Sequence, residues 1–293
     1  MKINKKNTLI SIFAFAFAFI VALSFCFAFN WPQVVENSDI FSSFFGQPRG
    51  SAYINSLIFE NPAEVFPAED GTVLIKLENG ISDMGWFEST LGNAVILNHS
   101  NDMLTVYGNL EEISLQDDMT NITSEIKIGT SGTSGWQKGK NCLEFQVIDT
   151  KSRNLINPFL LMPVIEKKDD LSIKNLVAIN NSGKVVPISN YQKINSGVYR
   201  LYIKKQPVGM TYKTSVLING AVAENIIYDV LTEKENRLAI KGKNLYSFEE
   251  LYPDDENQLL AEVILSNGRN IITITVEDYF GNSKTATYTV DVI

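Results

Sequence analysis

The sequence predicts an all-β fold, and three observations lead to that expectation. Beyond residue 70, short runs of β-branched and other apolar residues alternate with Gly, Asn, Asp and Ser, a pattern typical of strands and turns. No long stretch repeats its apolar residues with the period of a helix. The chain has 293 residues, of which 45% are hydrophobic and 20% charged. That composition indicates a globular protein and excludes global disorder, collagen and a coiled coil.

The expected strands fall into two groups, which we interpret as two β-rich modules, because a chain of this length has room for about two domains. In the first group they are GTVLIKL (71–77), NAVILNH (93–99), LTVYGNL (104–110), EIKIG (125–129) and LEFQVID (143–149). In the second they are LVAIN (176–180), VYRLYIK (198–204), KTSVLING (213–220), NIITITVED (270–278) and TATYTVDVI (285–293). Residues 244–257 are expected to form an excursion loop.

The first thirty residues are expected to direct export. Three lysines precede an uncharged apolar run over residues 9–29, the order of a secretory signal. The run is also long enough to cross a bilayer of roughly 30 Å. Three alternatives therefore stay open: a cleaved signal, an uncleaved anchor through residues 8–29, and lipidation at Cys26. The bulky Phe25 directly before the cysteine fits lipidation poorly. Each alternative places the rest of the chain in the periplasm or cell envelope.

These patterns divide the chain into five segments. Residues 1–30 form the signal peptide or membrane anchor, 31–49 a leader, 50–163 the first module, 164–171 a charged linker and 172–293 the second module, expected to be one β-sandwich. The ending NIITITVEDYFGNSKTATYTV resembles the last hairpin of bacterial immunoglobulin-like domains.

Charge and composition exclude several classes of function. The chain has 25 Lys and Arg against 33 Asp and Glu, a net charge of −8, which argues against a nucleic-acid partner. It has one histidine, His99, and two cysteines, Cys26 and Cys142. A site with two histidine ligands, a zinc ribbon and a disulfide-rich scaffold are therefore excluded.

The first module carries phrases in the order of a known family. EVFPAEDGTVL (64–74), LGNAVILNHSNDMLTVYGNL (91–110), IGTSGTSGW (128–136), CLEFQVID (142–149) and INPFLLMP (156–163) follow one another. Together they resemble the lysostaphin/LytM-type peptidoglycan metallopeptidases, which have the duplicated hybrid motif fold. The resemblance implies a LytM-like β-sheet module, followed here by the immunoglobulin-like β-sandwich.

The resemblance also implies a catalytic site that this sequence lacks. Family members hold one zinc ion with two His and one Asp, leave a position open for water, and use two further His residues. Here the former metal-ligand positions fall on Ser51, Asn55 and Glu144, with one residue of doubt in the register of the first two. The two assisting positions fall on Asn109 and Cys142. Neutral Ser and Asn bind zinc poorly, so no zinc cofactor and no catalytic residue are expected.

Other chemistries receive weaker support from the sequence. Cys142 with His99 could be a nucleophile and its base, and Glu144 with Asp70 an acid pair. We expect instead a buried thiol, a hydrogen-bonded strand-end histidine and a turn aspartate. The stretch GTSGTSG (129–135) lacks the features of a phosphate loop and is expected to be a tight loop, and the acidic residues 254–256 a solvated tip. The aromatic residues Trp86, Trp136 and Tyr107 are either core or groove lining.

The sequence therefore indicates an exported, catalytically degenerate LytM-like module, that is, a pseudoenzyme of the cell wall. Its expected partners are peptidoglycan or an envelope protein such as a cell-wall amidase, which it would regulate. The residues Ser51, Asn55, Asn109, Cys142 and Glu144 are the candidates for a binding groove. The alternative is an active peptidoglycan endopeptidase with an altered site around Glu144 and Cys142.

Overall fold

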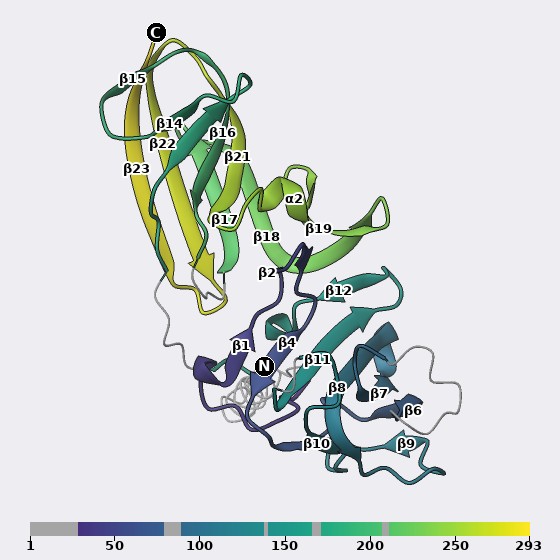
Figure 1. Ribbon diagram of the computed structural model, residues 1–293. Helices are drawn as coiled ribbons and strands as arrows, with labels where there is room; N and C mark the ends of the chain where they lie inside the picture. The colour runs from purple at the N-terminus through teal and green to yellow at the C-terminus, as the bar shows by residue number, and fades with distance from the viewer. Residues whose placement is uncertain (1–28, 79–88, 138–139, 166–170, 207–210) are drawn as a thin grey trace, which may run out of the picture.

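The computed structural model describes residues 29–78, 89–137, 140–165, 171–206 and 211–293. The expected signal or anchor and Trp86 lie outside these residues. Strands dominate the described chain, as the sequence predicts (Figure 1). None of its helices is long and apolar enough to cross a membrane, within the ranges just given.

The first part of the chain contains twelve strands and three short 3₁₀ turns, Ser38–Ile40, Ser100–Asp102 and Pro158–Leu160. The strands are β1 (Phe41–Ser43), β2 (Pro48–Arg49), β3 (Ala52–Tyr53), β4 (Leu57–Glu60), β5 (Glu64–Val65), β6 (Gly71–Leu77), β7 (Asn93–Asn98), β8 (Met103–Ile113), β9 (Asn121–Ile122), β10 (Gly129–Ser131), β11 (Cys142–Asp149) and β12 (Asn154–Ile156).

An antiparallel sheet forms the centre of this part. Its order runs β1-β4-β11-β8-β7-β6 by direct pairing. Strand β11 is buried on both faces from Cys142 to Val147, and its polar residues Glu144 and Gln146 are buried with the apolar ones. The expected strand at 71–77 coincides with β6. The expected strand at 125–129 is wrong, because only Gly129 enters a strand, β10, and the residues before it turn.

The second part contains β13 (Val177–Asn180), β14 (Val185–Pro187), β15 (Gln192–Ile194), β16 (Gly197–Lys204), β17 (Thr211–Ile218), β18 (Ala221–Lys234), β19 (Arg237–Lys241), β20 (Leu245–Ser247), α2 (Phe248–Leu251), β21 (Asn257–Leu265), β22 (Gly268–Asp278) and β23 (Ser283–Val292). A four-stranded sheet, β14-β13-β16-β21, packs on the β15, β17, β22 and β23 strands of the larger sheet. The apolar side chains between the two sheets are buried, and those of Leu201 and Ile274 are fully so. This part is thus a β-sandwich.

The expected excursion loop at 244–257 contains regular structure. Strand β20 pairs with β19, and α2 follows it directly. Ser247 starts the helix with a capping box, in which the Glu250 carboxylate accepts a hydrogen bond from the Ser247 backbone N–H at 2.7 Å. The sequence SFEE carries this signature, which the loop expectation overlooked.

The two parts share one sheet and one apolar core. Strand β12 pairs with β18, aligning Leu155 with Leu231, so the larger sheet runs from the first part into the second. Asn157 continues the junction, since its side-chain amide donates to the Tyr228 carbonyl at 3.0 Å. The leader packs here too, because Trp31 donates to the Pro163 carbonyl at 3.0 Å.

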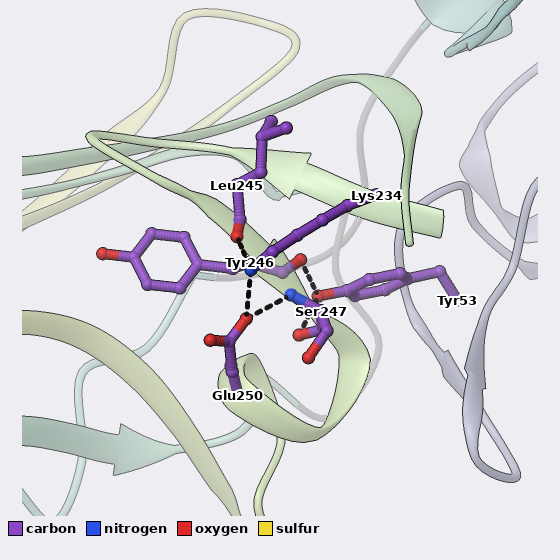
Figure 2. Close-up of polar contacts among 6 residues, drawn as sticks. All are labelled: Tyr53, Lys234, Leu245, Tyr246, Ser247 and Glu250. Carbon is purple, nitrogen blue, oxygen red and sulfur yellow. Dashed lines mark hydrogen bonds and ion pairs between the residues drawn. The ribbon is translucent and has the colours of Figure 1, made fainter. Parts of the chain in front are cut away.

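A second contact joins the β2–β3 hairpin to the segment around α2. The Tyr53 hydroxyl lies 2.8 Å from the Ser247 carbonyl and 3.1 Å from the Tyr246 carbonyl (Figure 2). Lys234 supports the same turn by donating to the Leu245 carbonyl and to the Glu250 carboxylate. Burial raises the pKa of Tyr53, so its hydroxyl keeps its proton and remains a donor. The second part of the chain thereby holds the hairpin in place.

We expect Tyr53→Phe to lower the free energy of unfolding by about 1–2 kcal/mol, because the Ser247 and Tyr246 carbonyl groups lose the one hydroxyl donor that they share. Urea unfolding of the full chain measures the change. Tyr191→Phe is the matched control, since that side chain is 72% exposed. Equal stability of the two variants would contradict a role for the Tyr53 hydroxyl.

Candidate functional site

A groove lies between the β2–β3 hairpin and the segment that leads into β11. Its volume is about 600 Å³, and its walls include the side chains of Arg49, Asn55, Ile58, Trp136, Gln137, Lys140 and Cys142. The hairpin turns through Gly50 and Ser51, where Gly50 adopts a φ of +60°, a conformation that glycine accepts readily. The turn pairs Arg49 with Ala52 across the hairpin, and Arg49 lines the groove.

Arg49 stacks on Trp136 across the groove. Its guanidinium carbon lies 3.3 Å from the centroid of the indole ring, a cation–π contact. Burial lowers the pKa of Arg49, and the nearby negative charge of Glu144 opposes that effect. The structure therefore places a guanidinium cation in the groove.

Glu144 lies behind the groove on β11. The side chain is only 3% exposed, and its carboxylate accepts hydrogen bonds from the amides of Gln137 and Gln146, the latter at 3.1 Å. Cys142, two residues earlier, is on the same side of the strand and is 2% exposed. Both candidate residues are therefore packed into the protein.

Asn109 ties the loop that precedes β11 to β8. Its amide nitrogen lies 2.7 Å from the Cys142 carbonyl and 2.5 Å from the Gly132 carbonyl, and its amide oxygen accepts from the Gly135 N–H at 2.7 Å. It is fully buried and has a φ of +63°, which Asn tolerates better than most residues. The position matched to a catalytic histidine here has a structural role.

The structure brings together four of the five groove candidates. Asn55 and Cys142 line the groove, whereas Asn109 and Glu144 lie buried behind it. Ser51 is exposed in the hairpin turn and is not among the lining residues.

The sequence analysis missed several lining residues and left the aromatic residues open. It did not single out Arg49, Gln137 or Lys140, because no motif marks them and the hairpin alone brings Arg49 to this place. Trp136 lines the groove, whereas Tyr107 is fully buried in the core.

The residues present do not fit the zinc ion of the lysostaphin/LytM type. Within the described ranges, no three His, Cys, Asp or Glu side chains lie where they could hold a metal ion. Of the positions matched to ligands, only Glu144 is ionisable, and two glutamine amides already bind its oxygens. A catalytic zinc needs three protein ligands and an open position for water, so we derive no metal-dependent step.

The alternative catalytic pairs do not form. The ring nitrogens of His99 face the Asp70 carbonyl at 3.0 Å and the Thr105 hydroxyl at 2.7 Å. The Cys142 thiol instead lies 3.2 Å from the Asn109 amide. Asp70 lines a different hollow, together with His99, and its carboxylate accepts from the Ser124 N–H at 2.7 Å. Neither a Cys–His dyad nor an acid pair with Glu144 is present.

The stretch 129–135 packs tightly against β8. Residues 129–131 form β10, and a Cβ atom on Gly132 would lie 2.4 Å from the backbone nitrogen of Glu111. This close approach explains the glycine without any bound phosphate. At the acidic residues 254–256, the Asp254 carboxylate accepts from the N–H groups of Glu256 and Asn257 and so shapes an exposed turn.

Fold and groove together define an all-β protein in which a groove-bearing sheet module is joined to a β-sandwich. Residues 57–158 match the model of Peptidase family M23, and we refer to this part of the chain as the M23 domain on the basis of that similarity. A second family model, which carries no description, matches residues 170–293. No curated protein matches the chain.

Solved structures of this kind of protein resemble the chain at low identity. The SpoIIQ–SpoIIIAH pore-forming complex contains a chain with 18% identity over 46% of this chain and 90% of its own length, with a TM-score of 0.35. LytU has 17% identity over 44% of this chain and 88% of its own length, with a TM-score of 0.34. Lysostaphin has 12% identity over 83% of this chain and 95% of its own length, with a TM-score of 0.33.

We expect the Cys142 thiol to react slowly in the native protein. Burial and the negative charge of Glu144 raise its pKa, so the thiolate, which is the reactive form, becomes populated only at higher pH than for a free thiol. In a Cys26→Ser variant, which leaves Cys142 as the only cysteine, a disulfide reagent should label the folded protein at least about tenfold more slowly than the unfolded one. Rapid labelling at pH 7 would contradict this.

Asn109→Ala should lower the free energy of unfolding by about 2–4 kcal/mol, because several buried backbone groups lose their partner and Ala is strained at this φ. Asn101→Ala is the matched control. Asn101 has a φ of +69° but is exposed, and its amide makes only a long, exposed hydrogen bond to Ser100 at 3.4 Å, so it tests chiefly the backbone strain. If the two variants lose equal stability in urea unfolding, the amide contacts of Asn109 contribute nothing.

Proposed function

We propose that this protein is an exported cell-envelope protein whose M23 domain is a pseudoenzyme and serves as a binding module. Its groove would bind peptidoglycan or a segment of an envelope protein, such as a cell-wall amidase that it regulates. The β-sandwich, as an immunoglobulin-like domain, would support the groove and present it in the envelope. The N-terminal segment would export the chain and, if retained, anchor it in the membrane.

One observation carries this proposal. A guanidinium cation stacked on Trp136 lies in the groove beside Asn55 and Cys142, two of the positions that the resemblance matches to the catalytic site. The guanidinium held there is incompatible with a metal cation at the same place, because like charges repel in a partly buried site. The groove nevertheless keeps the size and mixed polar and apolar lining of a ligand site.

The buried residues argue against the altered endopeptidase. A nucleophile or general base must reach the substrate, and Glu144 and Cys142 are 3% and 2% exposed. Their polar atoms are engaged by neighbouring amides, Gln137 and Gln146 for Glu144 and Asn109 for Cys142.

We expect the purified protein to contain no stoichiometric zinc and to release no fragments from purified peptidoglycan, while sedimenting with peptidoglycan or with its envelope partner. Elemental analysis, fragment chromatography and co-sedimentation on one preparation measure these properties. Cys142→Ala and Glu144→Ala should leave binding largely unchanged, because the two side chains are only 2% and 3% exposed and offer a ligand little surface. Trp136→Ala should weaken binding by about tenfold, since it removes the exposed aromatic wall.

Stoichiometric zinc together with cleavage would overturn the proposal and would return attention to Glu144 and Cys142. Loss of binding in Cys142→Ala or Glu144→Ala, with unchanged unfolding free energy, would also count against it.

A further inference from the structure

We infer that the groove binds the free carboxylate of a peptide, and that Arg49 is the residue that contacts this carboxylate. The inference deepens the proposed function and rests on it, since it names the chemistry that the groove would recognise. The inference depends on the charge of the groove, on how the side chain of Arg49 is held and on the size of the groove.

The charge of the groove is opposite to the charge of the chain. The chain carries a net charge of −8, yet the charged side chains that line the groove within the described ranges are Arg49 and Lys140, both cations. Glu144 lies behind the wall, with its oxygens bound by two amides. A basic groove on an acidic protein favours an anionic ligand group.

Arg49 is held in place without using its hydrogen-bond donors. Among the described residues its guanidinium forms no ion pair or hydrogen bond. It stacks on Trp136, and the charge of the buried Glu144 acts on it through space. A stacked guanidinium still presents N–H groups at its edge, where a planar carboxylate can accept two parallel hydrogen bonds. Arg49 is therefore arranged to bind an anion rather than to stabilise the fold through an acidic partner.

The second part of the chain fixes the position of this arginine. Arg49 lies on the hairpin that Tyr53 fastens to the Ser247 and Tyr246 carbonyls (Figure 2). A side chain held by both stacking and a fastened backbone loses little freedom on binding, which favours affinity.

The groove is larger than a simple inorganic anion needs. Its volume is about 600 Å³, and it offers the amide of Asn55 and the 42% exposed ring of Trp136 beside the two cations. An amide and an aromatic ring beside two cations suit a peptide, which brings backbone N–H and C=O groups and apolar side chains as well as a carboxylate.

The test uses the full chain and two pairs of probes. The first pair is soluble peptidoglycan fragments with free carboxylates and the same fragments with every carboxylate amidated. The second is an acetylated L-hexapeptide with a free carboxyl end and its amide. Calorimetric titration should give at least about tenfold tighter binding of the free acid in one pair or both, with affinity that falls as salt rises. Preference for fragments indicates a cell-wall source, and preference for the L-peptide a protein partner.

Variants then locate the carboxylate contact. Arg49→Gln should remove the preference for the free acid by weakening its binding about tenfold while leaving the amide unchanged. Arg49→Lys should keep part of the preference for the free acid, since lysine retains the positive charge but lacks the planar guanidinium that can donate two parallel hydrogen bonds. Arg269→Gln is the matched control, because that exposed arginine pairs with Asp291 at the far end of β22. Unfolding curves confirm that each variant folds.

The two proposals fail in different ways. Equal binding of acid and amide, or an Arg49→Gln variant that keeps the preference, overturns the carboxylate inference and leaves the groove as a ligand site. Binding of neither form in either pair overturns the proposed function and this inference with it.

Discussion

The antiparallel pairing of β12 with β18 is the interaction on which the rest of the structure depends. It aligns Leu155 with Leu231 and continues the sheet of the M23 domain into the β-sandwich. Buried residues of both parts, such as Phe145 and Tyr228, then belong to one apolar core. We therefore expect the two parts to unfold together, because separating them would expose that core and an unpaired strand edge.

This junction explains how a small hairpin becomes a wall of the groove. Strands β2 and β3 pair with each other over two residues each, which is too little for stability alone. The hairpin is held because Tyr53 bonds to backbone carbonyls next to α2, and α2 is in turn capped by Ser247 and Glu250. The geometry of the M23 groove is thus set partly by the second half of the chain.

Two of the positions that the resemblance matches to a metallopeptidase site have packing roles here. Asn109 binds the loop before β11, and Glu144 accepts hydrogen bonds from two glutamines, so both are satisfied within the fold. Polar residues left in a buried site are stable only when their hydrogen bonds are made. A network of this kind supports the observed groove and leaves its exposed edge to Arg49, Trp136 and Lys140.

The sequence by itself determined the all-β class, nine of the twenty-three strands in the described residues, the lysostaphin/LytM-type resemblance and the shortage of histidine ligands. Strand periodicity, turn residues and residue counts are local properties, and they can be read without coordinates. It did not reveal α2, although the capping box was present, and it placed a strand at 125–129 where the chain turns. Only the tertiary structure decided which side chains line the groove. Arg49 and Trp136 are 87 positions apart and carry no motif, and they meet only because long-range strand pairing and the contact of Tyr53 bring the hairpin to the loop before β11.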